Sequence, residues 1–169
     1  PVLAGEPALS GEGTGNGDGP FTVTYTIADE AVWDDGSPIT SADIEFTWKA
    51  TLETTGTLTT VGYDKIASVD TSDPKVAVVE FSEPLASWAD LFGSCCGVLL
   101  KADAFESEDI ADDLSRELPF SGGPFVLESF DDDGAVLARN EAYWDDDRRA
   151  LLDRVNVVAM ADQDTEINA

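Results

Sequence analysis

A strictly alternating segment near the N-terminus constrains this chain more than any other feature. Between residues 21 and 27, apolar side chains occupy every second position and threonines fill all of the others. A period of two predicts a β-strand with one buried face. The turn-forming segment Trp33–Pro38 follows, and Ile44, Trp48 and Leu52 then recur every four positions along one face of a predicted helix. The sequence thus predicts a strand, a turn and a helix in that order.

The start of this helix carries a capping pattern. Thr40 precedes it and Asp43 stands three positions later, which is a capping box with Asp in place of Glu. We expect Asp43 to accept hydrogen bonds from free N–H groups at the helix start. In the turn before it, Gly36 permits a tight bend, Pro38 fixes its own φ, and Trp33 is expected to anchor the turn on the core.

The rest of the chain alternates between short elements and breaks. Residues 10–20 are rich in glycine and predict a surface loop, because they lack both the Gly-Lys-Ser/Thr ending of a phosphate-binding loop and a complete G-x-G-x-x-G. Strands outnumber helices and follow one another in adjacent runs, which favours an α+β fold. The expected elements are strands at 65–69 and 75–81 with a turn at 72–74, a helical stretch at 84–92, a helix over 101–116, a hairpin of 125–130 and 135–139 turned at 133–134, and a last strand over 155–159.

Composition excludes several classes of protein. The 169 residues include 35 acidic and 9 basic side chains, a net charge of −26, yet 43% are hydrophobic, which is too many for a disordered acidic tail. No apolar run approaches the length of a membrane span, and the acidity argues against nucleic acid. Histidine is absent, which removes histidine-based catalysis and metal binding. We interpret the charge as a solubility and salt-tolerance trait, with a preference for cationic ligands as the alternative.

The two cysteines are neighbours. Cys95 and Cys96 stand too close along the chain for an ordinary disulfide, which favours two buried thiols over a strained vicinal disulfide or a reactive thiol. There is no second pair to complete a zinc site, and we expect neither a metal nor a cofactor.

The acidic clusters offer little functional information. The run Asp131–Gly134 resembles part of a calcium loop, but Ser129 and Asn140 then stand where Asp and Glu belong, so a hairpin turn is favoured. With 35 acids in the chain, carboxylate pairs of the glycosidase type occur at any spacing and do not discriminate.

Three segments carry specific information, and they occur in a fixed order. Trp33–Asp43 reads W-D-D-G-S-P-I-T-S-A-D, Ser121–Leu127 reads S-G-G-P-F-V-L, and Arg139–Trp144 reads R-N-E-A-Y-W. This set resembles the family 5 extracellular solute-binding proteins, the peptide- and nickel-binding components of ABC importers, over roughly residues 21–169. Departures from the family pattern are a one-residue difference in spacing, because Ser41 stands between Thr40 and Ala42, and the substitutions at 121, 122 and 125.

The resemblance implies a fold and a division of the chain. The fold is the large three-subdomain, type II form of the periplasmic binding proteins, with a mixed or antiparallel sheet and flanking helices. Residues 1–20 would be a Gly-rich leading segment, 21–118 a small α+β subdomain of the N-terminal lobe, and 119–169 the crossover back into the main part of that lobe. Members are much longer, so the chain is expected to be part of a binding protein whose second lobe closes on the ligand.

The resemblance also implies a function. The expected role is the capture of a solute outside the cytoplasm, at the cell surface or in the periplasm, and its delivery to the membrane permease of an ABC importer, without bond-making chemistry. Oligopeptides or dipeptides are the favoured ligands, because an extended peptide can use backbone hydrogen bonds in a roomy cleft; nickel chelates and oligosaccharides are alternatives. The protein would be a monomer that contacts the membrane through a lipid anchor absent from this chain.

Six residues are the candidate ligand contacts that the resemblance implies. Tyr63, Ser94, Cys95 and Cys96 would lie near the cleft, and Gly122 and Gly123 would lie where the chain passes between subdomains. Ordinary packing is the alternative for each of them.

Two other functions stay open on the residues alone. One is a stand-alone α+β module that recognises a protein partner or a cationic surface. The other is a hydrolase working through carboxylates, which would need one acid with a strongly raised pKa inside a cleft.

Overall fold

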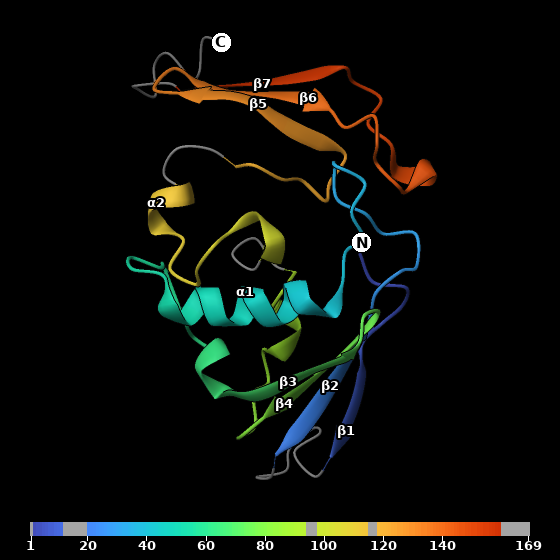
Figure 1. Ribbon diagram of the computed structural model, residues 1–169, viewed down its shortest axis with the longest axis vertical. Helices are drawn as coiled ribbons and strands as arrows, with labels where there is room; N and C mark the ends of the chain where they lie inside the picture. The colour runs from blue at the N-terminus through green and yellow to red at the C-terminus, as the bar shows by residue number, and fades with distance from the viewer. Residues whose placement is uncertain (1, 12–19, 94–97, 115–117, 160–169) are drawn as a thin grey trace. The chain divides into compact units, whose positions relative to one another are not determined.

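The computed structural model describes residues 2–11, 20–93, 98–114 and 118–159 (Figure 1). The chain folds into two compact units. The first unit consists of residues 1–31 and 38–116, and the second unit consists of residues 32–37 and 117–169. The chain therefore enters the second unit twice, first for six residues and then for its whole C-terminal part.

A four-stranded sheet forms the centre of the first unit. Its strands are ordered β1-β2-β4-β3, and every neighbouring pair is antiparallel. The four strands are β1 (Ala8–Gly11), β2 (Phe21–Thr26), β3 (Ile66–Asp73) and β4 (Val76–Phe81).

The alternation in β2 does build one buried face. Val23 on β2 stands opposite Val79 on β4, and both are buried. Phe21 stands opposite Phe81, and their rings stack with centroids 4.6 Å apart. Cross-strand pairs on one face are the contacts that stabilise a sheet, so the predicted face is confirmed as the centre of the core.

Strand β1 contradicts the loop predicted from residue 10 onward. Ser10 and Gly11 belong to it, and residues 12–19 lie outside the described part. All four β1 residues are exposed, so the strand has no buried face to produce an alternating pattern. It exists because the edge of β2 offers unpaired backbone groups, which Ala8–Gly11 pair with.

Helix α1 (Ser41–Glu53) packs against β3 and β4, and the predicted capping box is confirmed at its start (Figure 1). The predicted apolar stripe is only partly right. Ile44 is buried, but Trp48 is half-buried and Leu52 is exposed. The buried face instead includes three polar side chains, Ser41, Asp43 and Thr47, whose hydrogen bonds are described below.

The helix predicted over 101–116 is wrong across its described residues. Only a 3-10 turn η3 (Ala102–Ala104) and a single helical turn α2 (Ala111–Leu114) form there. Backbone N–H groups at Ala102 and Ile110 bond to side chains of the α1 region instead of to their own segment. A tertiary partner therefore displaces local helix formation. Two further 3-10 turns are η1 (Tyr63–Lys65) and η2 (Trp88–Asp90), the latter lying inside the helical stretch expected over 84–92.

The second unit contains a three-stranded antiparallel sheet in the order β5-β6-β7. The predicted hairpin and last strand are confirmed. The turn lies at residues 132–133, because Gly134 already belongs to β6 and pairs with Asp131. Gly134 has φ +141°, and a Cβ there would lie 1.9 Å from the carbonyl oxygen of Val157, so only glycine fits. The elements are β5 (Phe125–Asp131), β6 (Gly134–Arg139), the 3-10 turn η4 (Asp146–Arg148) and β7 (Arg154–Val158).

The described residues contain neither a membrane-spanning helix nor a metal-binding cluster. None of their helices has both the length and the apolar character needed to cross a membrane. They also contain no cluster of three or more acidic or cysteine side chains able to hold a metal ion.

Candidate functional site

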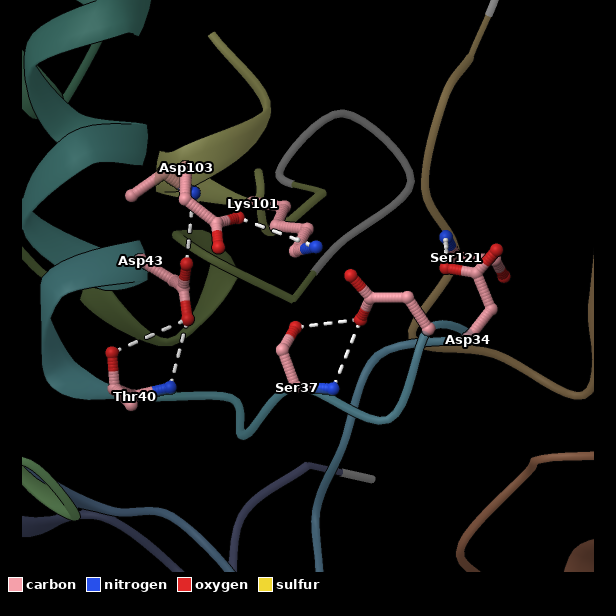
Figure 2. A network of polar contacts seen from close by, with 9 residues as sticks. Asp34, Ser37, Thr40, Asp43, Lys101, Asp103 and Ser121 are labelled. Atoms are coloured by element: carbon pink, nitrogen blue, oxygen red, sulfur yellow. Dashed lines mark hydrogen bonds and ion pairs between the residues drawn. The ribbon is translucent and has the colours of Figure 1, made fainter.

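The turn Trp33–Ser37 closes on itself through one carboxylate. The Asp35 Oδ1 accepts the backbone N–H of Ser37 at 2.9 Å and its hydroxyl at 2.6 Å (Figure 2). The Trp33 N–H donates to the Ser37 carbonyl at 2.9 Å, and Gly36 adopts φ +82° within the bend. The sequence W-D-D-G-S thus specifies one turn geometry, with glycine at the position that needs a positive φ.

Asp34 joins this turn to the second motif. Its N–H donates to the Ser121 carbonyl at 2.9 Å, and the Ser121 N–H donates back to its Oδ1 at 2.8 Å (Figure 2). Beside this pair, the edge of the buried Trp33 ring meets Phe120, with centroids 5.3 Å apart. Trp33 therefore anchors the turn as predicted, and it does so on Phe120 of the second unit.

Asn140 joins the third motif to the second. Its side-chain Nδ2 donates to the Gly123 carbonyl at 2.9 Å, and its Oδ1 accepts the N–H of Ala142 at 3.0 Å. Its backbone N–H donates to the Pro124 carbonyl at 2.9 Å. Because Asn140 is buried, these bonds replace the hydrogen bonds to water that it loses on folding. The three motifs that lie far apart in the sequence therefore meet in the second unit.

A parallel arrangement ties α1 to the segment beyond residue 98 in the first unit. The buried Asp43 accepts the Thr40 N–H on Oδ2 and the Ala102 N–H on Oδ1, each at 2.8 Å (Figure 2). One turn later, the Thr47 hydroxyl oxygen accepts the Leu100 N–H at 2.9 Å. The capping aspartate thus has a second role, which the capping pattern alone did not predict.

Lys75 fastens both points at which the chain leaves and re-enters the first unit. Its Nζ lies 3.0 Å from the Ala28 carbonyl, 3.4 Å from that of Ala31 and 3.0 Å from that of Ile39. Carbonyl oxygens around an ammonium group satisfy its donors without a carboxylate. No local sequence signal predicts this role, because nothing nearby distinguishes Lys75 from an exposed turn lysine.

Tyr63, a predicted ligand contact, holds the turn at Phe92. Only 5% of its surface is exposed, and burial raises the pKa of its phenol. The hydroxyl oxygen accepts the Phe92 N–H at 3.1 Å, the two rings meet edge to face, and the Tyr63 carbonyl accepts the Trp48 indole N–H. Phe92 has φ +59°, a conformation that bulky residues rarely adopt and that these contacts support. A ligand contact by Tyr63 stays a prediction.

The other predicted contacts divide into two groups. Ser94, Cys95 and Cys96 lie outside the described residues. Gly122 and Gly123 are half-buried in the loop that Asn140 holds. Nothing crowds Gly123, because a Cβ there would lie 3.7 Å from its nearest neighbour. Ligand contact by the two glycines therefore also stays a prediction.

The first unit contains a cavity of about 550 Å³ beside the C-terminal half of α1. Of the predicted site residues that the structure describes, Tyr63 alone lines it. Among the described residues, its lining comprises Ala50, Thr51, Thr54, Thr55, Gly56, Thr57, Leu58, Thr59, Tyr63, Val98, Leu100, Ile110, Ala111 and Leu114.

Among the described residues, the carboxyl groups of Asp70 and Asp109 have lowered pKa values, the opposite of what a glycosidase general acid needs. Backbone N–H donation from Ser72 lowers the pKa of Asp70, and donation from Thr55 lowers that of Asp109. A general acid at neutral pH needs a raised pKa. The two carboxylates therefore act by holding backbone N–H groups in place.

The sequence as a whole was compared with known families and proteins. Residues 7–169 match the model of the bacterial extracellular solute-binding proteins, family 5, middle part. The chain belongs to this family. The expected resemblance is thereby confirmed, and in the structure each of the three motifs forms a hydrogen bond with another of them.

Two relatives in Mycobacterium tuberculosis illustrate the likeness of this family 5 chain to named proteins. The "Probable monoacyl phosphatidylinositol tetramannoside-binding protein LpqW" is 37% identical over 128 residues, which are 74% of this chain and 20% of the relative. The oligopeptide-binding protein OppA is 34% identical over 150 residues, 85% of this chain and 25% of the relative. The chain thus spans about a fifth to a quarter of the length of these relatives.

Solved structures confirm the fold of the family 5 chain. NikZ from Campylobacter jejuni, in complex with Ni(L-His), superposes with a TM-score of 0.80 at 18% identity, over 99% of this chain and 32% of that one. Listeria monocytogenes OppA bound to peptide gives a TM-score of 0.75 at 21% identity, over 99% and 35% of the two chains. The expected periplasmic-binding-protein fold is therefore confirmed for this portion, and every strand pairing in its described residues is antiparallel.

Proposed function

We propose that this chain is part of the solute-binding component of an ABC importer, which captures a solute outside the cytoplasm and delivers it to a membrane permease. The observation that carries the proposal is the family match over residues 7–169. The three joined motifs support it, because they fall inside that match and their contacts with one another are made in the structure. The role is binding and delivery, without turnover of the solute.

The proposed ligand is an oligopeptide. OppA of Mycobacterium tuberculosis matches 85% of this chain, and its name states oligopeptide binding. Peptides also suit a binding protein physically, because every residue offers one backbone donor and one acceptor whatever its side chain. A mannosylated lipid is the second candidate, because the relative named for binding one has the higher identity, 37%.

The proposed arrangement of the intact protein follows the family. Residues 21–118 would form the small subdomain of the N-terminal lobe, and 119–169 would lead back into the main part of that lobe. The protein would act as a monomer held at the outer face of the membrane by a lipid anchor. The half-exposed sheet of the second unit supports this arrangement, because its uncovered apolar side chains suit burial in a larger lobe.

The decisive experiment measures ligand binding by the whole polypeptide as its gene encodes it. Mass spectrometry of the protein purified from its host identifies any bound solute, and calorimetry with a defined peptide pool and with mannosylated lipid then ranks the two classes. We expect stoichiometric peptide binding by the whole protein, and binding at least about tenfold weaker by the 169-residue chain. Tight peptide binding by this chain alone, or measurable peptide turnover, contradicts the proposal.

The predicted glycine contact has a test of its own. Gly123→Ala adds a methyl group where the nearest neighbour lies 3.7 Å away, so it leaves stability nearly unchanged. If Gly123 contacts the ligand, this variant of the whole protein loses affinity. Gly5→Ala is the matched control, because nothing lies within 4 Å of a Cβ there. Equal affinities in both variants remove Gly123 from the binding site.

A further inference from the structure

The cavity in the first unit has an unusual composition for this chain. Charged residues make up 26% of the sequence, yet none of the described residues lining the cavity is charged. Burying a charge against an uncharged wall is unfavourable, because the wall supplies no counter-charge to replace the lost water. The cavity therefore selects against charged occupants, within a protein whose net charge of −26 also repels anions.

The threonines in the wall contribute less polarity than their number suggests. The Thr51 hydroxyl donates to the Thr47 carbonyl at 2.7 Å, the Thr54 hydroxyl to the Glu108 carbonyl at 3.1 Å, and the Thr57 hydroxyl to the Thr54 carbonyl at 2.8 Å. Each of these protons is committed to a protein acceptor. An occupant would gain no donated hydrogen bond from these three hydroxyl groups.

The apolar residues of the wall divide into a buried base and an exposed rim. Leu100 and Ile110 are buried, whereas Leu58 is 88% exposed and Val98 is 68% exposed. Covering such side chains gains about 25 cal/mol for each Å² of apolar surface removed from water. A volume of about 550 Å³ lies within the range of small-molecule sites.

We propose that this cavity is a binding site for an uncharged aliphatic chain, of the kind found in an acyl group or a long-chain alcohol. The uncharged wall, the committed protons of these three threonines and the exposed rim all favour an apolar occupant. Ile110 and Leu100 would contact the enclosed end of the chain, and Leu58 and Val98 would cover its outer part. The inference does not depend on which solute the importer carries.

The test uses the whole protein as its gene encodes it and a neutral apolar dye, N-phenyl-1-naphthylamine, whose fluorescence rises in apolar sites. We expect saturable dye binding that 1-dodecanol displaces, with dodecanoate at least about tenfold weaker because it carries a charge. Ala111→Phe fills the cavity, and Leu58→Asp places a charge at its rim. Each is expected to weaken dodecanol binding by about tenfold or more.

The matched control is Leu151→Asp, since Leu151 is 95% exposed but belongs to the second unit and does not line the cavity. It should bind dodecanol like the unaltered chain. If Ala111→Phe fails to fold by circular dichroism, Leu58→Asp decides alone. Unchanged affinity in Leu58→Asp, an equal loss in Leu151→Asp, or equal displacement by dodecanoate overturns the proposal. The proposal is also overturned if an oligopeptide displaces the dye and Leu58→Asp weakens peptide binding as much as it weakens dodecanol binding. The cavity would then be a peptide site.

Discussion

The two units of this protein differ in what holds them together. In the first unit, β2 and β4 bring large side chains face to face, and Phe81 is completely buried. In the second unit, the sheet leaves Phe130 70% exposed and Val158 63% exposed. The second unit nevertheless contains two of the three family motifs entirely, and the turn of the remaining one.

The comparison shows that the family motifs lie mostly outside the best-packed core of this protein. The motifs of the second unit encode side-chain bonds to the backbone, at Asp34 and Asn140, which fix loops. Each such bond contributes about 1 kcal/mol, whereas complete burial of a large apolar side chain contributes about 1.5–3 kcal/mol. Most of the stability should therefore come from the first unit, whereas the hydrogen bonds of the second unit mainly fix the geometry of its loops.

The largest expected effect compares two phenylalanines. Phe81→Ala removes a buried ring that stacks on Phe21, and should lower the free energy of unfolding by about 3–5 kcal/mol. Phe130→Ala is the matched change in the second unit and should cost less than about 1 kcal/mol. Urea unfolding followed by circular dichroism measures both. Equal losses would show that the second unit has a core as important as the first.

The next effect concerns the carboxylate that ties α1 to Ala102. Asp43→Ala removes the acceptor of two backbone N–H groups and should cost about 2–3 kcal/mol. Asp43→Asn keeps an acceptor of the same shape and should recover about half of that loss. Denaturant midpoints of the two variants test this order, with Asp132→Ala in the exposed hairpin turn as a control near zero. An equal loss in Asn and Ala would show that the single acceptor left by Asp43→Asn contributes nothing to stability.

A smaller effect is expected at Asn140 in the second unit. Asn140→Asp keeps the acceptor for Ala142 but places a carboxylate oxygen against the Gly123 carbonyl, at a cost of about 1–2 kcal/mol. Hydrogen exchange should quicken at the amides of Asn140 and Ala142, while those of β2 and β4 stay protected. Faster exchange throughout the β2–β4 pair would instead show that the two units unfold together.

The smallest effect concerns Tyr25, whose buried hydroxyl has no hydrogen-bond partner among the described residues. Tyr25→Phe should therefore stabilise the protein at neutral pH by about 1 kcal/mol. Burial also raises the pKa of Tyr25 above its ordinary value of 10.0. Because the folded pKa is the higher one, its contribution is complete below pH 10.0 and is lost as the pH rises beyond that value. The stability gap between variant and parent should accordingly widen above pH 10.0, in thermal unfolding measured across that range.

Local pattern was enough for the elements whose partners lie nearby in the sequence. The alternation over residues 21–27 determined β2, and the Thr40 and Asp43 pair determined the start of α1. The β5–β6 hairpin could be predicted from its turn residues alone. The same holds for the family, because the three motifs are short and keep their order. Among the site residues, pattern identified Trp33 and Asp43 for what they do locally.

Tertiary structure decided what local pattern could not. Strand β1 has no buried face and forms only because β2 offers an edge, and the segment 101–114 is held by Asp43 and Thr54 instead of by its own helix. The carbonyl cluster around Lys75 and the uncharged cavity likewise join residues far apart in the chain. The physical reason is that a periodic pattern records which side of an element is buried, whereas a buried polar group takes whichever partner the fold brings within reach.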